Sequence, residues 1–544
     1  MNMKTKRLLL TIVLSTMMLN QVYPQLPFMV KDINPGGASS LCTNLTDVNG
    51  TLFFSSYNGT EGLELWKSDG TQGGTVMVKD INAGPNNSQP VFLENVNGVL
   101  FFQAADGIHG SELWKSDGTA AGTEMVKDIN VGATASDPAE LTNVNGILYF
   151  RANDGTNGDE LWKSDGTTNG TVLVKDINPG IAGSSSVSFT NINNTLFFRS
   201  YDGANGDELW KSDGTAAGTV MVKDINPAFN TGGLGTYPFF TNVNGILFFV
   251  ANNGINEREL WKSDGTDQGT VMVKDINSGP GSSIPWGLMN ANGTLYFQAD
   301  DGINGTELWK SDGTDAGTTM LLDIKPGING SDPASLTNVN GTVFFQAQEA
   351  TNGLELWKSD GTTAGTVLVK DINPGLNSSE PNEFTNVNGT LYFYASEITT
   401  GQELWKSDGT SAGTELVVDI AAGANSSSPD NLINVNGTLF FVALNNSGRE
   451  LWAWNITTSI AQNNFNDPAV FIYPNPATDE LNITYSNGNE LIEVILYDIF
   501  SHQIFRQSFT NSTTLKTDQL ADGIYFYELR SKKGTLKTGK VVKQ

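Results

Sequence analysis

The tripeptide Glu-Leu-Trp recurs nine times along the chain, and this repeat limits the possible folds more than any other feature. The tryptophans are mostly 48 residues apart, with one spacing of 51 and one of 47, and eight copies continue as Lys-Ser-Asp-Gly-Thr. A fixed period of this length indicates structural units that each pack against their neighbours. The nine tryptophans are Trp66, Trp114, Trp162, Trp210, Trp261, Trp309, Trp357, Trp405 and Trp452.

Turn signals divide each unit into four short strands. In the unit that contains Trp162 we expect strands at 140–144, 147–152, 160–164 and 172–177. Asn145-Gly146, between the first two, is a strong hairpin signal because both residues tolerate a positive φ. The second strands are apolar on both faces, which predicts that both faces are covered. Four strands in about 40–50 residues are typical of a β-propeller blade.

The two ends of the repeat region complement each other. A lone fourth strand, Phe28–Ile33, precedes the first complete unit, and three strands without a fourth, within 431–454, follow the eighth. Together they would make a ninth unit. The predicted fold is therefore all-β, a β-propeller of about nine four-stranded blades closed by the termini and followed by a small antiparallel β-sandwich. An open array or two smaller rings are the alternatives, because propellers usually have four to eight blades.

The repeat resembles the bacterial ELWxxDGT repeat family, and its strand order is similar to that of kelch-type propeller blades. The resemblance covers roughly residues 28–454 and rests on Glu-Leu-Trp-Lys-Ser-Asp-Gly-Thr, which returns nearly verbatim. It implies an architecture and supplies little chemistry.

Polar residues that recur in every unit are expected to serve the scaffold, since a functional site usually breaks the symmetry of a repeat. Glu64, like its eight counterparts, is predicted to be structural and to face Lys79 across the third and fourth strands. Asp69 of Ser-Asp-Gly-Thr is predicted to accept backbone N–H groups within its turn. Asp80 and its equivalents are interpreted as scaffold, and the nine tryptophans as packing between units.

The loops fall into two sets, because successive strands of an antiparallel sheet reverse direction. The Asn-Gly and Ser-Asp-Gly-Thr turns share one edge and hardly vary. The loops between second and third strands and the long loops between units share the opposite edge, here called the variable rim. The three extra residues of the 51-residue spacing are placed in the loop around 229–237. Variable loops on a rigid scaffold often bind ligands, and the candidate ligand-face residues are Asp106, Asp154, Asp159, Asp202, Asp207, Asp300 and Asp301.

Charge and composition exclude several classes of function. With 58 acidic and 31 basic residues the net charge is −27, which argues against nucleic acid as a partner. His109 and His502 lie in unrelated segments, so most histidine-based metal or acid–base sites are excluded. Ca²⁺ is the one cofactor that the rim aspartates suggest, because it takes six to eight oxygen ligands. No single loop has a calcium-loop pattern, and solvated turn residues are the alternative interpretation.

Residues 1–24 are predicted to form a signal peptide, with a basic start and the apolar run Leu8–Leu19. This run is too short to cross a bilayer, and no later stretch approaches the ~20 apolar residues that a transmembrane helix needs. The composition changes after Trp454. The expected organisation is thus a signal peptide at 1–24, the repeat propeller at 25–454, a polar linker at 455–469 and a small sandwich domain at 470–544.

Three motifs of the last segment resemble the type A sorting domain of type IX secretion. The resemblance implies a Bacteroidetes-type bacterium, Sec export, passage through the outer membrane with the type IX machinery as partner, and removal of the domain on release or surface attachment. The protein would then be secreted or held at the outer-membrane cell surface. The motif residues are Tyr473, Pro474, Asn475, Pro476, Gly523, Tyr525, Gly539 and Lys540.

The sequence favours a binding or adhesion module that takes an extracellular carbohydrate or protein at the variable rim. The alternative is an extracellular polysaccharide hydrolase or lyase, whose paired carboxylates would come from Asp154, Asp202 or Asp301. A purely structural surface-layer protein is the third hypothesis. No asymmetric catalytic cluster stands out, so the balance is against an enzyme, and we expect a monomer.

Overall fold

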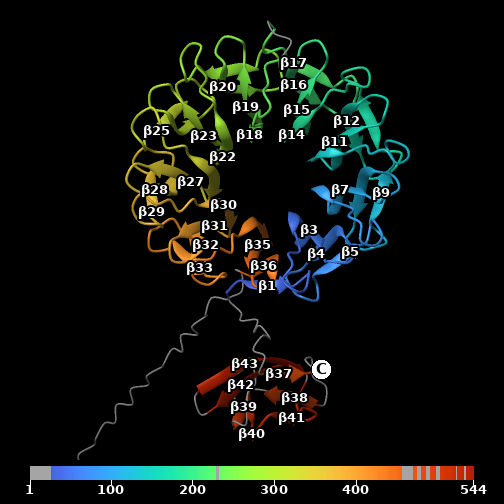
Figure 1. The fold of residues 1–544 in the computed structure, drawn as a ribbon, viewed down its shortest axis with the longest axis vertical. Coiled ribbons are helices and arrows are strands. Elements are labelled where there is room, and N and C mark those ends of the chain that lie inside the picture. The colour runs from blue at the N-terminus through green and yellow to red at the C-terminus, as the bar shows by residue number, and fades with distance from the viewer. Residues whose placement is uncertain are drawn as a thin grey trace, which may run out of the picture. The chain divides into compact units, whose positions relative to one another are not determined.

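The computed structural model describes residues 26–227, 232–455, 470–473, 480–485, 491–497, 503–521, 523–531 and 534–543. All regular elements in these ranges are β-strands (Figure 1), and none of these residues belongs to a helix able to span a membrane. The chain divides into two compact units, one comprising Gln25–Ile456 and the other containing Thr457–Gln544.

The first unit is built from nine four-stranded antiparallel sheets, numbered here as sheets 1–9. Sheets 1–8 each use four successive strands in chain order. Sheets 1–4 are β2–β5 (Thr43–Val48, Thr51–Tyr57, Leu63–Ser68, Val76–Lys79), β6–β9 (Val91–Val96, Val99–Ala105, Ser111–Ser116, Glu124–Lys127), β10–β13 (Ala139–Val144, Ile147–Asn153, Asp159–Ser164, Val172–Lys175) and β14–β17 (Val187–Ile192, Thr195–Tyr201, Asp207–Ser212, Val220–Lys223). Sheets 5–8 are β18–β21 (Thr241–Val243, Ile246–Asn252, Arg258–Ser263, Val271–Lys274), β22–β25 (Trp286–Ala291, Thr294–Asp300, Thr306–Ser311, Thr319–Leu322), β26–β29 (Ala334–Val339, Thr342–Glu349, Gly353–Ser359, Val367–Lys370) and β30–β33 (Asn382–Val387, Thr390–Glu397, Gly401–Ser407, Glu415–Val418).

Sheet 9 joins the two ends of the repeat region. Its strand order is β1-β36-β35-β34, formed by Phe28–Lys31, Gly448–Asn455, Thr438–Asn445 and Asp430–Val435. Phe28 lies opposite Ala453, and Met29 lies opposite Trp452. The prediction that the lone first strand completes the last unit is therefore confirmed.

The strand boundaries follow the turn chemistry of the repeat. Asn145 and Gly146 have φ values of 53° and 82° and connect β10 to β11 as a tight hairpin. The second strand of each sheet is buried on both faces, as Leu52, Phe53 and Phe54 in β3 show. Each of these strands lies between two neighbouring sheets, which explains why its sequence is continuously apolar.

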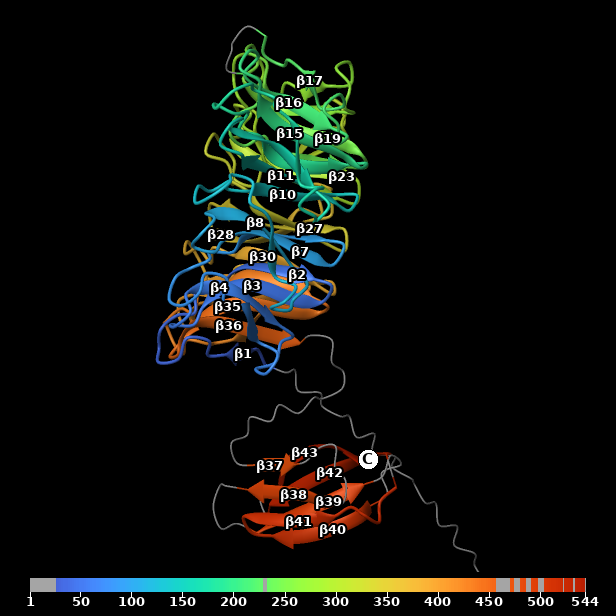
Figure 2. The same cartoon turned by 90° about the vertical axis from the view of Figure 1, so that its right-hand side faces the viewer.

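The sheets pack face to face through shared apolar clusters. Phe53 and Leu65 of sheet 1 pack with Leu100, Phe102 and Trp114 of sheet 2, so the repeated tryptophan is packing between units, as predicted. The first strands of consecutive sheets contact one another from β2 to β34, and β34 contacts β2. Figure 1 shows these sheets arranged in a circle, and Figure 2 shows the same unit from the side, where it is narrower.

The Asn-Gly edge carries a repeated hydrogen bond between sheets. Asn143 Nδ2 donates to the carbonyl of Asn95 in the preceding sheet at 3.2 Å, and Asn95 Nδ2 donates to that of Asp47 at 3.3 Å. Asn191, Asn242, Asn290, Asn386 and Asn434 make the equivalent bond. Sheet 1 has Asp47 at this position and no amide to donate.

The second unit contains a three-stranded sheet, β37-β38-β41, and a four-stranded sheet, β40-β39-β42-β43. Leu481 and Leu515 of the smaller sheet pack with Val494 and Leu529 of the larger one in a single apolar core. Two antiparallel sheets around one core match the expected small sandwich. The strands are Val470–Tyr473, Glu480–Tyr485, Ile492–Tyr497, Gln503–Phe509, Ser512–Lys516, Gly523–Ser531 and Gly534–Lys543 for β37–β43 in order.

Candidate functional site

The repeated glutamates lie in the interior and hold the loops between sheets. Glu64 Oε2 accepts hydrogen bonds from the Ile81 N–H at 2.8 Å and the Ser88 hydroxyl at 2.6 Å, and Oε1 accepts the Ser88 N–H at 3.0 Å. Eight counterparts are equally inaccessible, with no exposed surface. We call each such glutamate with its loop partners a carboxylate latch.

The predicted pairing of Glu64 with Lys79 is wrong. A β-bulge between β4 and β5 places Lys79 opposite Leu65, one residue from the expected register. The Lys79 ammonium instead lies 5.7 Å from the centre of the Trp114 ring in sheet 2 and donates to the Thr123 carbonyl at 2.6 Å. The structural role predicted for the glutamates is supported, but the partner is the backbone of the next loop.

Burial raises the pKa of the latch carboxyls. The pKa of Glu112 rises to about 7, with Asp128 adding to the rise and the hydrogen bonds from Ser136 and Ile129 opposing it. The same value of about 7 applies to Glu160, Glu208, Glu307, Glu355 and Glu450. These carboxyls have shifted pKa values because they are structural and buried, and no substrate can reach them.

The turn carboxylates behave as the sequence predicts. Asp69 Oδ1 accepts the Thr71 N–H at 2.9 Å and the Thr71 hydroxyl at 2.7 Å. Asp80 Oδ2 accepts the Gly84 N–H at 3.1 Å and so stabilises the loop that follows β5.

Most of the rim aspartates chosen from the sequence fold back onto their own loops. Asp154 Oδ1 accepts the N–H groups of Thr156 and Asn157, and its Oδ2 accepts the Asn157 amide at 2.7 Å. Burial acts to raise the pKa of this carboxyl, but the hydrogen bonds outweigh it and the pKa is lowered. Asp106, Asp202 and Asp301 have the same arrangement and the same direction of shift.

The other three candidates also have partners within the scaffold. Asp159 accepts the Asn153 amide at 3.2 Å, Asp207 lies 3.1 Å from Arg199 Nε, and Asp300 accepts the Gly302 N–H at 2.7 Å. Within the described ranges, no three His, Cys, Asp or Glu side chains gather in a way that could hold a metal ion. Each of the seven aspartates is thus held by its own loop or by a neighbouring side chain among the described residues.

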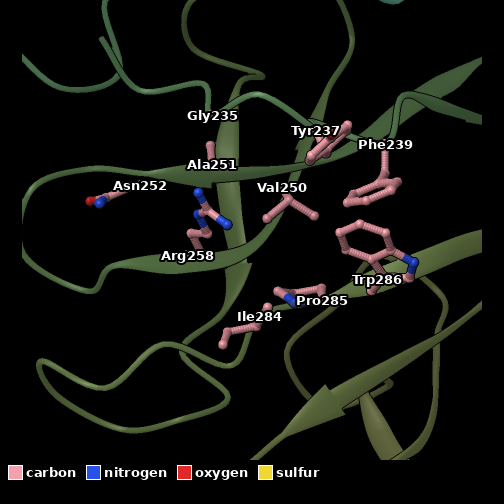
Figure 3. Close-up of a pocket in the computed structure, with 10 residues that line it drawn as sticks. All are labelled: Gly235, Tyr237, Phe239, Val250, Ala251, Asn252, Arg258, Ile284, Pro285 and Trp286. Carbon is pink, nitrogen blue, oxygen red and sulfur yellow. The ribbon is translucent and has the colours of Figure 1, made fainter. Parts of the chain in front are cut away.

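An asymmetric cleft lies elsewhere on the variable rim, between sheets 5 and 6 (Figure 3). Tyr237 and Phe239 come from the loop before β18, Arg258 begins β20, and Trp286 begins β22. The remaining lining residues are Gly235, Val250, Ala251, Asn252, Ile284 and Pro285. We call this site the aromatic cleft.

Three aromatic rings form one wall of the aromatic cleft. The centres of the Phe239 and Trp286 rings are 4.3 Å apart, and the Tyr237 ring centre lies 5.7 Å from that of Trp286. Tyr237 is 62% exposed and Trp286 is 43% exposed. Single-domain surfaces rarely carry a cluster of large, solvent-exposed aromatic side chains. Such exposed apolar patches mark interaction sites.

Backbone hydrogen bonds fix the loop that carries these rings. The Val250 N–H donates to the Pro238 carbonyl at 2.8 Å, and the Asn252 N–H donates to that of Gly233 at 2.8 Å. From sheet 4, Arg199 Nη1 donates to the Gly235 carbonyl at 3.2 Å. The aromatic wall is thus held in place before any ligand arrives.

Arg258 gives the aromatic cleft its positive charge. Its guanidinium makes no hydrogen bond or ion pair with the described residues, and the side chain is exposed. The equivalent residue in sheet 9 is Arg449, which pairs with Asp430 at 2.6 Å. The position of Asp430 is occupied in sheet 5 by Pro238, so Arg258 lacks the acid that its counterpart has.

The first of two sequence signals for this site was the single 51-residue spacing. The extra residues were placed around 229–237, and Tyr237 does belong to the aromatic cleft, although 228–231 lie outside the described residues. Trp286 carried a second signal, because none of the other first strands has an aromatic residue at the matching position. The rim prediction considered carboxylates alone and therefore missed the aromatic cluster.

The sorting motifs lie partly in the second unit's strands. Tyr473 ends β37, Gly523 begins β42, and the Tyr525 hydroxyl donates to the Ala521 carbonyl at 2.7 Å. Gly539 and Lys540 lie in β43, opposite Tyr527 and Phe526. Pro474, Asn475 and Pro476 lie outside the described residues, as do residues 1–24 of the predicted signal peptide.

Solved structures with some likeness to the chain have low sequence identity and low TM-scores. A puromycin hydrolase is 12% identical with a TM-score of 0.35, over 65% of this chain and 58% of its own. A prolyl endopeptidase is 9% identical with a TM-score of 0.38, over 92% of this chain and 56% of its own. An extracellular domain named as part of a hybrid two component system of B. thetaiotaomicron is 10% identical with a TM-score of 0.32, over 95% and 74%. The chain spans less than two thirds of the first two proteins.

No curated protein matches the chain. Residues 471–544 match the family described as a secretion system C-terminal sorting domain. This match covers the strands of the second unit and the three motifs that resemble the type IX domain. The chain therefore carries a type IX C-terminal sorting domain, which engages the type IX secretion machinery and directs the protein to the cell surface or the medium.

Proposed function

We propose that the protein is an exported binding module whose ligand lies on the aromatic cleft of the variable rim. The observation that carries this proposal is the coincidence of two asymmetries. The one 51-residue step of the repeat and the exposed cluster of Tyr237, Phe239 and Trp286 occur at the same place. Elsewhere the repeat keeps a nearly constant scaffold, so an irregular aromatic cluster on its variable edge has the character of a ligand site.

The scaffold of this module is, in our proposal, a closed β-propeller of nine blades built from ELWxxDGT-type repeats. The pairing of β1 with β36 supports closure, because it joins segments more than 400 residues apart in sequence. A carboxylate latch strengthens the same junction, where Glu450 accepts the N–H groups of Ile33 and Ser40 at 3.0 and 3.1 Å. A closed ring of blades leaves only short, protected sheet edges and gives the rim loops a rigid base.

The lining of the aromatic cleft favours binding over catalysis. Glycoside hydrolysis needs two carboxyl groups about 5–10 Å apart, and the ten lining residues include no Asp or Glu. The rim carboxylates proposed for the hydrolase alternative are engaged in their own turns. Ca²⁺ at the rim stays a prediction without a described cluster to carry it, and the monomeric state is likewise proposed.

The test is an array of carbohydrates and extracellular-matrix proteins, probed with the exported protein and with Trp286→Ala. Loss of the Trp286 ring, which is 43% exposed and contacts Tyr237 and Phe239, should weaken binding at least tenfold, since a few large aromatic residues carry most of the energy of such surfaces. Phe92→Ala is the control for loss of an exposed aromatic ring elsewhere on the rim, because Phe92 is 48% exposed against 43% for Trp286 and contacts no other ring among the described residues. Unchanged binding by Trp286→Ala would disprove this function, and turnover of a bound polysaccharide would favour the hydrolase.

A further inference from the structure

We infer that the aromatic cleft binds a carboxylate-bearing sugar residue of a polysaccharide, with the sugar ring against Trp286 and Tyr237 and its carboxylate at Arg258. This inference rests on the proposed function and adds the chemical class of the ligand. It follows from the shape of the cleft, the arrangement of its rings and the environment of Arg258.

The shape of the cleft favours a flat ligand that lies on the surface. Its enclosed space is only about 10 Å³, roughly that of one water molecule, so it cannot surround the anchor side chain of a peptide partner. Tyr237 and Trp286 instead present open ring surface. A pyranose has one face of C–H groups, and this face matches an aromatic ring without needing a deep pocket.

The rings are positioned before binding. Trp286 is tilted by 59° to Phe239 and by 58° to Tyr237, whereas Tyr237 and Phe239 are nearly parallel at 28°. Each side chain is therefore restrained by the other two. Little side-chain entropy therefore remains to be lost when a ligand binds. A smaller entropic cost raises the affinity of an open surface for a sugar ring.

The charge of the ligand follows from the comparison of sheets 5 and 9. In sheet 9 the guanidinium of Arg449 is neutralised by Asp430 and also donates to the Ser428 carbonyl at 2.8 Å. In sheet 5 the guanidinium of Arg258 has neither kind of partner among the described residues and lines the same cleft as the rings. A planar guanidinium is well suited to a carboxylate, which it can bind with two parallel hydrogen bonds.

The neighbouring acid does not neutralise Arg258. Glu257 Oε2 accepts the Asn252 amide at 3.0 Å and makes no ion pair with Arg258 among the described residues. An uncompensated cation is notable in a chain with 58 acidic residues against 31 basic ones. The cleft thus combines an apolar platform with one positive charge, and a hexuronate residue offers the complementary face and charge in a single ring.

The experiment compares acidic polysaccharides with their neutral derivatives, using the exported full chain. The probes are polygalacturonate, alginate and hyaluronan, each against its methyl-esterified or carboxyl-reduced form, which keeps the sugar ring and removes the charge. We expect at least one acidic polymer to bind at least tenfold more tightly than its neutral form. Arg258→Gln should reduce that binding to the level of the neutral form, and Arg449→Gln, as the matched control, should leave it unchanged.

Two sets of results would overturn the inference while leaving the proposed function intact. One is binding that requires Trp286 but is equal for the acidic and neutral forms and insensitive to Arg258→Gln, which would indicate a neutral glycan. The other is Trp286-dependent binding on the array to a protein and to none of the polysaccharides. If Trp286→Ala changes binding to no ligand at all, the proposed function itself fails, and the inference fails with it.

Discussion

At the scale of single residues, the carboxylate latch explains why Glu-Leu-Trp always keeps its glutamate. The carboxylate receives backbone N–H groups that a loop between sheets would otherwise leave unpaired in the interior, where an unpaired polar group costs about 1–3 kcal/mol. The serine of the latch can serve either protonation state. Ser88 Oγ donates to Glu64 Oε2, but it also lies 3.3 Å from the Leu63 carbonyl, to which its hydroxyl can turn if the glutamate carries a proton.

The latches predict how stability depends on pH. A carboxyl whose pKa is about 7 in the folded chain and about 4.5 when unfolded binds more protons in the folded state between those values. The free energy of unfolding of the repeat unit should therefore be highest near pH 5 and fall as the pH rises through 7. Denaturant titrations followed by tryptophan fluorescence report this unit alone, because all eleven tryptophans lie between Trp66 and Trp454.

The control for this pH dependence is Glu160→Gln, which removes one titrating group. It should lower stability by about 1–3 kcal/mol, because an amide cannot accept hydrogen bonds at both terminal atoms, and it should make the pH dependence shallower. A free energy of unfolding that rises from pH 5 to pH 8 would contradict the raised pKa values.

At the scale of elements, the sequence predicts the strands and their order well. It predicts poorly which side chains of different strands and loops contact one another. Turn residues such as Asn145-Gly146 mark the strand ends directly, and the apolar second strands indicate burial on both faces. The bulge opposite Leu65 leaves no trace in the spacing, so the Glu64–Lys79 pairing could not be corrected from sequence. The aromatic cleft combines side chains from three separate segments of the chain, and the sequence showed only the irregular spacing and the unusual Trp286, not that they meet.

The amide contacts at the Asn-Gly edge supply a prediction about the junction of sheets 9 and 1. In Asp47→Asn, the new side-chain amide should donate to the carbonyl of Asn434, as Asn95 does to that of Asp47. We expect an increase of about 0.5–1.5 kcal/mol in the free energy of unfolding. The acceptor role of Asp47 toward the Gly50 N–H is preserved, because Asn95 makes the same contact with Gly98.

The reverse substitution, Asn386→Asp, provides the control at a junction between consecutive units. It removes the donor to the Asn338 carbonyl and should lower stability by a similar amount. If Asn386→Asp is destabilising and Asp47→Asn has no effect, residue 47 does not lie beside sheet 9 and the closed ring is wrong.

At the scale of the whole molecule, an acidic repeat scaffold presents an irregular aromatic cleft and carries a type IX sorting domain. The number of units, the complementary ends and the sorting motifs were all visible in the sequence, because each depends on local patterns. The proposed ligand site was not, because the spacing marks one irregular loop but does not show which side chains of the next unit lie beside it. The rim aspartates that the sequence suggested as ligand residues instead accept hydrogen bonds within the scaffold. The exposed aromatic residues of the cleft do not follow the repeat pattern.

Trp286 is the most direct probe of whether the ligand lies on the aromatic cleft. It is the only tryptophan with a substantially exposed side chain among the described residues. Titration of the exported protein with the bound polysaccharide should change its fluorescence and protect it from acrylamide quenching. In Trp286→Phe, which keeps a ring at this position, the change should vanish while binding measured by calorimetry persists. An equal fluorescence change in Trp286→Phe, or none in the unmodified protein despite binding, would place the ligand elsewhere.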